Sequence, residues 1–199
     1  MFWFNGLLFA YTLFLLFLAL SYGYGSYKKS RGSEIEESIS IEEITVVVAF
    51  RNEIENLRRL LEQIHGLKTR PAEFLFVDDH SKDGGTELIK DIQDSDVTLL
   101  SMKDKTGKKE AVFAGVCCAQ TPYVLCWDAD ISFSEGYFEK LSTLARHSLI
   151  ILPVAYKSTR FFEWFFEIDV SLANYINHSS AAIHRPLLCS GANLLFEKS

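Results

Sequence analysis

The sequence predicts an α/β protein: a Rossmann-like, mostly parallel sheet with flanking helices, preceded by one N-terminal transmembrane helix. Short β-branched or aromatic runs alternate with segments that carry one apolar stripe at helical spacing, which predicts the sheet and its helices. One of these runs, five apolar or aromatic residues at 123–127, stops abruptly at two carboxylates, Asp128 and Asp130. An uncharged stretch at the N-terminus predicts the membrane segment.

The first 27 residues are predicted to be a membrane anchor. No charged side chain lies between Phe2 and Tyr27, and a helix of that length would be about 39 Å long, enough to cross a bilayer core of about 30 Å. The basic residues Lys28, Lys29 and Arg31 follow directly, which predicts a single pass through the cell membrane with the rest of the chain facing the cytoplasm. The alternative is a cleaved signal peptide, but the segment lacks a basic n-region.

The remaining chain divides into a linker and a folded domain. Residues 28–43 are polar and rich in acids, as in a solvated linker, and residues 44–199 are long enough for one substantial core. The net charge of −6, with both signs spread along the chain, argues against a nucleic-acid partner. The four cysteines contain no Cys-x-x-Cys pair, which fits a reducing compartment.

Predicted strands and helices alternate from residue 44 to residue 154. A β-branched run at 44–50 predicts a buried parallel strand, and the apolar stripe from Leu57 to Ile64 predicts a helix that Gly66 ends. The same rhythm predicts, in order, a strand at 73–77, a short helix at 88–92, a strand at 97–100, a basic loop at 103–109, a helix at 111–119, a strand at 123–127, a helix at 138–144 and a strand at 149–154. Such alternation is typical of parallel strands joined by right-handed crossovers.

Two later segments depart from this rhythm. Residues 161–177 crowd aromatic side chains into one helix-compatible segment, which either packs over the edge of the sheet or rests on the bilayer surface. Residues 187–196 resemble a pair of strands with Gly191 at the bend.

Polar clusters follow three of the predicted strands. They are Arg51-Asn52-Glu53, Asp78-Asp79 and Asp128-Ala129-Asp130. Because the carboxyl ends of parallel strands open onto one edge of a sheet, these clusters are expected to share a ligand. Asp128 and Asp130 would lie roughly 7 Å apart on one side of an extended segment, which suits Mg²⁺ or Mn²⁺ carried by a nucleotide diphosphate. The alternative is a turn whose acids bond only to local amides.

The combination of motifs resembles a family-2 glycosyltransferase. In order, these motifs span residues 46–53, 76–84, 107–111, 127–130 and 189–193. The resemblance implies the A-type glycosyltransferase fold and an inverting transfer from a nucleotide-diphospho-sugar donor. It also implies an acceptor that is a glycan or a lipid-linked sugar.

The resemblance also implies roles for individual residues. Nucleotide binding would fall to Ala49, Arg51, Asn52, Glu53, Asp78, Asp79, Lys108 and Asp128, with Ala49 standing where the family commonly has proline. Asp128 and Asp130 would bind the metal, and Gly191, Ala192 and Asn193 would border the donor sugar.

The general base is the one part of the family mechanism that the sequence does not supply. Family members carry it in an acidic motif further along, which is expected beyond Ser199, so no catalytic residue is assigned. A nucleotide-binding fragment without transferase activity is therefore an alternative. An aspartyl phosphotransferase, in which Asp128 would be the nucleophile, is another.

Overall fold

The structure is a computed structural model that describes residues 37–155, 164–182 and 191–198, together with helical residues 6, 9, 11–17, 19, 20 and 23. The chain forms two compact units. One comprises Glu36–Leu152 with Gly191–Ser199, and the other comprises Met1–Ile35 with Pro153–Ser190. The predicted boundaries at residues 27 and 43 stay a prediction.

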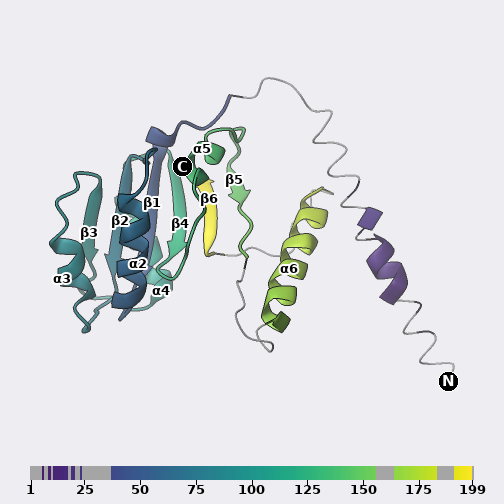
Figure 1. Cartoon of the computed structure of the whole chain (residues 1–199), viewed down its shortest axis with the longest axis horizontal. Helices are drawn as coiled ribbons and strands as arrows, with labels where there is room; N and C mark the ends of the chain where they lie inside the picture. The colour runs from purple at the N-terminus through teal and green to yellow at the C-terminus, as the bar shows by residue number, and fades with distance from the viewer. Residues whose placement is uncertain are drawn as a thin grey trace. The chain divides into compact units, whose positions relative to one another are not determined.

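The first unit is built on one mixed sheet (Figure 1). Its elements are, in chain order, η1 (Ile41–Glu43), β1 (Ile44–Phe50), α2 (Ile54–His65), β2 (Glu73–Asp78), α3 (Gly85–Lys90), β3 (Val97–Ser101), α4 (Lys108–Cys118), β4 (Tyr123–Asp128), α5 (Tyr137–Leu141), β5 (Leu149–Ile151) and β6 (Asn193–Glu197). The strand order is β3-β2-β1-β4-β6-β5, with β1 to β4 parallel and β6 antiparallel to both of its neighbours. The predicted α/β class with a mostly parallel sheet is confirmed.

Strand β1 lies where the strand order reverses. The chain adds β2 and β3 on one side of β1 and then returns to place β4 on the other side. In open parallel sheets the crevice at such a reversal, beyond the carboxyl ends of the strands, is where ligands bind. The fold therefore directs attention to the loops that follow β1, β2 and β4.

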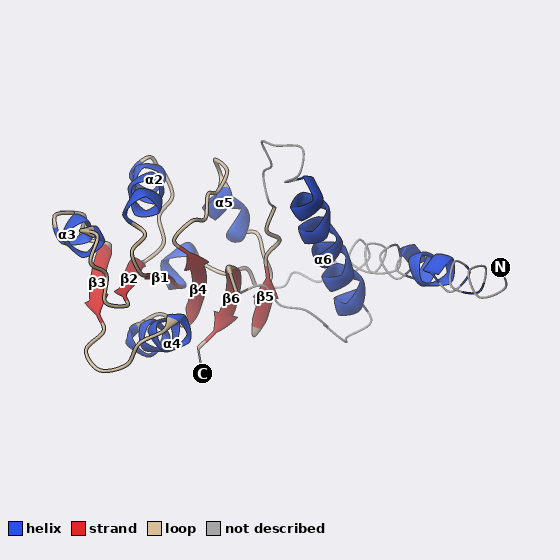
Figure 2. Ribbon diagram, turned by 90° about the horizontal axis from the view of Figure 1, so that it is seen from below, coloured by secondary structure: helices blue, strands red, loops and turns tan. Residues whose placement is uncertain are grey.

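Each face of the sheet has its own core because successive strand side chains point to opposite faces. Val46 and Val48 pack in the core formed with α2, α3 and α5, whereas Val47 and Ala49 pack in the core beneath α4. Figure 2 shows the same division, with α2, α3 and α5 on one side of the sheet and α4 on the other. All seven residues of β1 are buried, as expected for a strand covered on both faces.

Helix α4 packs closely on the sheet at Gly115. A Cβ atom built on Gly115 would lie 2.5 Å from Val47 Cγ1 and 2.9 Å from Val77 Cγ2. The absence of a side chain at residue 115 therefore lets the helix backbone approach β1 and β2. This contact fixes α4, whose first residues border the candidate site.

Several predicted boundaries differ from the structure. The helix predicted at 88–92 is α3 at 85–90, and the helix predicted at 138–144 ends at residue 141. Helix α4 begins at Lys108, three residues before the predicted start at residue 111, since the helix is capped at Gly107 rather than at the first apolar residue. Strand β5 ends at Ile151 rather than 154. The amide of Leu152 still bonds to Asn193 O, so the pairing with β6 continues one residue beyond the end of the strand.

The second unit contains α6 (Trp164–Ala182), which confirms from residue 164 onward the helix predicted at 161–177. The side chains of Trp164, Phe165 and Phe166 are each more than half exposed. Among the described residues, no helix has the length and apolar character needed to cross a membrane. Much of the predicted anchor at 1–27 lies outside the described residues, as do residues 187–190 of the predicted strand pair.

Candidate functional site

A cavity of about 380 Å³ opens at the carboxyl edge of the sheet. Its walls come from the ends of β1, β2 and β4 and from the first turn of α4. The lining residues are Ala49, Phe50, Arg51, Glu53, Asp79, Gly107, Lys108, Ala111, Asp128, Ala129 and Asp130. The structure thus brings the three predicted strand-end clusters together around one space.

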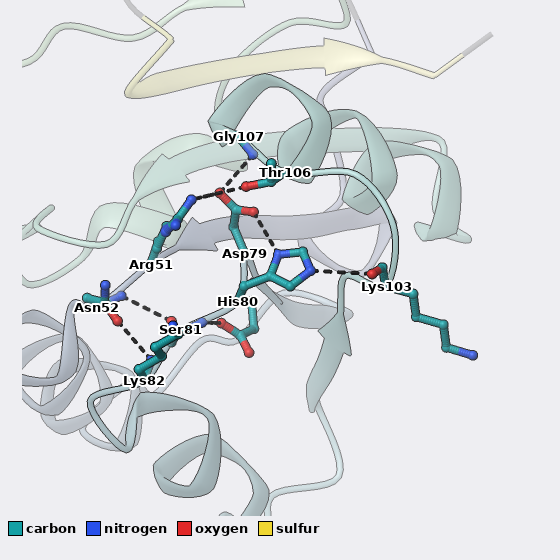
Figure 3. A network of polar contacts seen from close by, with 10 residues as sticks. Arg51, Asn52, Asp79, His80, Ser81, Lys82, Lys103, Thr106 and Gly107 are labelled. Atoms are coloured by element: carbon teal, nitrogen blue, oxygen red, sulfur yellow. Dashed lines mark hydrogen bonds and ion pairs between the residues drawn. The ribbon is translucent and has the colours of Figure 1, made fainter.

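The loops after β1 and β2 are bonded to each other. The backbone of Asn52 has φ 54°, a left-handed conformation that asparagine tolerates better than most residues. Its amide donates to Ser81 Oγ at 3.0 Å, and its side-chain Oδ1 accepts from the amide of Lys82 at 2.8 Å (Figure 3). Asn52, predicted to bind nucleotide, lies beside the cavity and joins the two loops that form its wall.

Asp78 and Asp83 organise the loop after β2. Both side-chain oxygens of the buried Asp78 accept hydrogen bonds, one from the amide of Ser81 in this loop at 2.8 Å and one from Thr86 Oγ1 at the start of α3 at 2.7 Å. Asp78, also predicted to bind nucleotide, does not line the cavity. Asp83 accepts from the amide of Ile54 at 2.8 Å and so caps the first turn of α2. The sequence analysis missed this role because the capping residue lies in a different loop from the helix it caps.

Asp79 is the most heavily bonded carboxylate of the site. Its Oδ2 accepts from the Gly107 amide at 2.9 Å and lies 3.5 Å from Arg51 Nη1, and its Oδ1 lies 3.2 Å from His80 Nδ1 (Figure 3). Burial alone would raise the pKa of Asp79. The hydrogen bonds from His80, Gly107 and Thr106, together with the charge of Arg51, outweigh burial and hold that pKa below its usual range. Asp79 is therefore ionised at neutral pH and fixes the loop before α4 to the end of β2.

Glycine at residue 107 is required by its conformation. Its φ of 113° and ψ of 146° lie in a region that side chains with a Cβ rarely adopt. This conformation aims its amide at Asp79 while placing Lys108 at the first position of α4. The start of a helix favours anions, since its first amides have no partners within the helix.

Lys108 and the two acids at the end of β4, Asp128 and Asp130, form the other side of the cavity. Lys108 Nζ lies 2.6 Å from Asp128 Oδ1. Asp130 is exposed and lines the same space two residues further on. No group of three or more histidine, cysteine or acidic residues suited to a metal occurs among the described residues. A cation between Asp128 and Asp130 would therefore take its remaining ligands from a bound phosphate or water, and hard carboxylate oxygens suit Mg²⁺ or Mn²⁺ in that way.

Asn193 lies inside the protein rather than on the cavity wall. It is 4% exposed, and its Oδ1 accepts from Trp127 Nε1 at 3.2 Å and from Tyr137 Oη at 2.6 Å. It therefore joins the start of β6 to the segment that carries Asp128 and Asp130. Of the three residues predicted to border the donor sugar, Gly191, Ala192 and Asn193, none lines the described cavity.

The sequence matches the family model for glycosyl transferase family 2 over residues 45–191. The chain belongs to that family. This membership confirms the predicted resemblance and decides against the aspartyl phosphotransferase, since the match includes every strand-end motif described above.

Two comparisons with individual family-2 relatives match only part of each sequence. The chain is 33% identical over 91 residues to a poly-β-1,6-N-acetyl-D-glucosamine synthase of Staphylococcus aureus, which is 45% of this chain and 22% of the relative. It is 30% identical over 95 residues to the synthase of the same name from Staphylococcus epidermidis, 47% of this chain and 23% of the relative. The chain thus spans about a fifth of the length of these curated relatives.

A solved structure shares the fold more widely. The mannosyltransferase PcManGT from Pyrobaculum calidifontis, in complex with GDP-Man and Mn²⁺, superposes with a TM-score of 0.60 at 17% identity. The superposition covers 92% of this chain and 55% of the mannosyltransferase. The mixed sheet with flanking helices is therefore like the A-type glycosyltransferase fold.

Proposed function

We propose that this family-2 chain binds a nucleotide-diphospho-sugar at the cavity beyond β1, β2 and β4 and transfers the sugar to an acceptor. The observation that carries the proposal is the position of Lys108, the first residue of α4, whose ammonium group pairs with Asp128 at the end of β4. The ammonium group of Lys108, the start of α4 and the two carboxylates then line one cavity. The ammonium group and the helix start favour the phosphates, and the carboxylates favour the metal ion.

The walls of the cavity suggest where each part of the donor binds. Arg51 and Asp79 lie at the ends of β1 and β2, and we assign them to the base and ribose with Glu53 beside them. Lys108 would face the diphosphate, where its charge offsets the negative charge that develops as the sugar leaves. We assign Asn52 and Asp78 a supporting role, because their hydrogen bonds hold the loops that form this wall.

Asp128 and Asp130 are the residues that would hold the divalent cation. The superposed mannosyltransferase was solved with Mn²⁺ and GDP-Man, which supports a metal-dependent donor site in this fold. When bound, Mg²⁺ or Mn²⁺ would neutralise charge on the leaving diphosphate. Both carboxylates line the cavity, and their hard oxygen atoms fit a metal that arrives with its nucleotide.

We propose an inverting transfer to a glycan or a lipid-linked sugar. In such a displacement the acceptor oxygen bonds to the anomeric carbon, the bond from that carbon to the phosphate oxygen breaks, and the acceptor proton passes to a general base. We assign no described residue to that base. The names of the staphylococcal relatives, synthases of a poly-N-acetylglucosamine, support a glycan acceptor.

Calorimetric titration tests the donor site. The full chain is titrated with UDP, GDP, ADP, CDP and dTDP, each with Mn²⁺, with Mg²⁺ and with EDTA. We expect one nucleotide to bind, with higher affinity when a metal is present, and the Asp128→Asn variant to lose the metal-dependent gain. Binding of none of the five, or equal binding with metal and with EDTA, would contradict the proposed site.

Incorporation of labelled sugar tests transfer. Membranes from cells that express the chain are incubated with labelled GDP-mannose or UDP-N-acetylglucosamine, and the glycan and lipid fractions are counted. More incorporated label than in an Asp130→Asn control would support sugar transfer by this chain. Nucleotide binding without incorporation of label would contradict transfer and support a nucleotide-binding function instead.

We also propose that residues 1–27 anchor the protein in the cell membrane by a single pass, with the sheet unit in the cytoplasm. The uncharged stretch and the basic cluster after it support this topology. The protein should stay in the pellet after a carbonate wash, and a reporter fused after residue 199 should be active only inside the cell. Release by carbonate, or a reporter active outside, would contradict the anchor.

A further inference from the structure

His80 lies between two loops of the site. It is the second residue after β2 and has a left-handed backbone with φ 63°, a conformation that histidine adopts more readily than most residues. Its ring lies between two partners (Figure 3): Nδ1 is 3.2 Å from Asp79 Oδ1, and Nε2 is 3.4 Å from the backbone oxygen of Lys103.

Both partners of the ring are acceptors only. A carboxylate and a peptide carbonyl have no proton to donate, and a neutral imidazole carries only one N–H. A neutral His80 would satisfy one partner and turn a lone pair toward the other. Only the imidazolium, with two N–H groups, donates to Asp79 and Lys103 at once.

The segment held in this way is the loop at 102–107, between β3 and α4. Its start is fixed by the amide of Met102, which donates to Asp78 O at 3.0 Å, and its end by the amide of Gly107, which donates to Asp79. The contact from His80 to Lys103 adds a third attachment, near the start. Directly beyond this loop lies Lys108, which we assign to the diphosphate.

We propose that His80 is a positioning residue that holds loop 102–107 against the end of β2 when its ring carries both protons, and releases it when the ring loses one. The contacts of His80 with Asp79 and Lys103 do not depend on the proposed function. The consequence for nucleotide affinity does rest on it.

The charges around the ring favour the doubly protonated form. The hydrogen bonds to Asp79 and to the Lys103 carbonyl raise the pKa of His80, whereas the charge of Arg51, from the end of β1, opposes them. Lys103 faces the ring with its backbone oxygen and directs its ammonium away (Figure 3). Because the pKa in the folded protein is raised, the attachment is complete below the ordinary pKa of histidine, about 6.5, and is lost as the pH rises through the raised value.

Nuclear magnetic resonance of the full chain without nucleotide tests the attachment. The titration of the His80 ring is followed together with hydrogen exchange at the Gly107 amide, corrected for the intrinsic rise of exchange with pH. We expect a His80 pKa above its ordinary value and faster Gly107 exchange once the pH passes it. The Asp79→Asn variant should lower the His80 pKa.

His80→Asn is the matched control, because asparagine also tolerates the left-handed backbone but has no ring to titrate. Its Gly107 amide should show no pH-dependent step. A His80 pKa at or below the ordinary value, or a Gly107 step that persists in His80→Asn, would overturn the proposal.

Nucleotide titration extends the test to function. The affinities for UDP and for GDP with Mn²⁺ are measured on both sides of the His80 pKa. For whichever binds, we expect a fall of about fivefold or more above that pKa in the parent chain and none in His80→Asn. A fall of the same size in both proteins would overturn the positioning role. Failure of both nucleotides to bind would count against the proposed function instead, and the resonance experiment would still decide the attachment.

Discussion

Lys108 Nζ lies 2.6 Å from Asp128 Oδ1, so the first residue of α4 is paired with the last residue of β4. The lysine side chain is 65% exposed and the aspartate 27%, which means that water screens much of their attraction. The pair therefore contributes little to folding. Its position at the mouth of the cavity is what gives it significance, because a diphosphate that enters would face the same ammonium group.

Replacing Lys108 by methionine should separate binding from stability. The free energy of unfolding should change by less than about 1 kcal/mol, as for exposed ion pairs. Loss of a charged contact to phosphate should lower nucleoside diphosphate affinity by about tenfold or more. Lys109→Met is the control, since Lys109 is exposed but does not line the cavity. Equal losses of affinity in the two variants would show that only general charge matters.

Asp130→Asn should leave the fold intact and remove the metal dependence of nucleotide binding. Asp130 is exposed, and substitutions at such positions usually change stability by no more than about 0.5 kcal/mol. Calorimetry should then give the same affinity with Mn²⁺ as with EDTA, while Glu135→Gln, an exposed acid in the same loop, should keep the difference. If Asp130→Asn unfolds the domain, the acid has a structural role.

Gly115→Ala should destabilise the protein by about 1–3 kcal/mol, as measured by urea denaturation. The added methyl group would lie 2.5 Å from Val47 Cγ1 and 2.9 Å from Val77 Cγ2, so α4 must move away from the sheet. Phe113→Ala, at an exposed position of the same helix, should change stability far less. Val47→Ala combined with Gly115→Ala should cost less than the sum of the two single changes, because the smaller side chain makes room. If the effects of the two substitutions are additive, the destabilisation by Gly115→Ala does not come from the contact with Val47.

Tyr137→Phe should lower stability by about 0.5–1.5 kcal/mol, the typical contribution of one hydrogen bond. Burial raises the pKa of Tyr137 to about 12, against the smaller lowering effect of hydrogen bonds to Trp127 and Asn193. Because the folded pKa is raised, this contribution is complete below the unfolded value of about 10 and is lost as the pH rises toward 12.

Thermal denaturation between pH 9 and 12 checks this prediction for Tyr137. The parent chain should lose stability more steeply than the Tyr137→Phe variant over the upper part of that range. A Tyr123→Phe variant is the control for the effect of removing a different tyrosine hydroxyl. Parallel curves for the parent and Tyr137→Phe would mean that burial does not raise the pKa of the Tyr137 hydroxyl.

The α/β class and the location of the site could be predicted from sequence for one reason. The β-branched and aromatic runs of strands and the apolar stripe of a helix are local properties, so the order of elements from β1 to β5 follows from pattern alone. Parallel strands then place their carboxyl ends on one edge, which brings Arg51, Asp79 and Asp128 together without further information.

The roles of individual polar side chains depend instead on contacts between residues far apart in the sequence. Asp78 and Asp79 are adjacent and chemically identical, yet of the two only Asp79 lines the cavity. The carboxylate of Asp78 accepts from Ser81 and Thr86 shortly after it, whereas Asp79 accepts from the amide of Gly107, which lies beyond the next strand.

Asn193 is a second residue whose role cannot be predicted from the local sequence. The antiparallel pairing of β6 with β4 places it opposite Trp127, and its oxygen is used by Trp127 and Tyr137 inside the protein. The sequence determined the fold class and the acids that end its strands. The tertiary structure decided which side-chain oxygens remain available to a ligand, because a hydrogen bond to a distant residue cannot be predicted from the local sequence pattern.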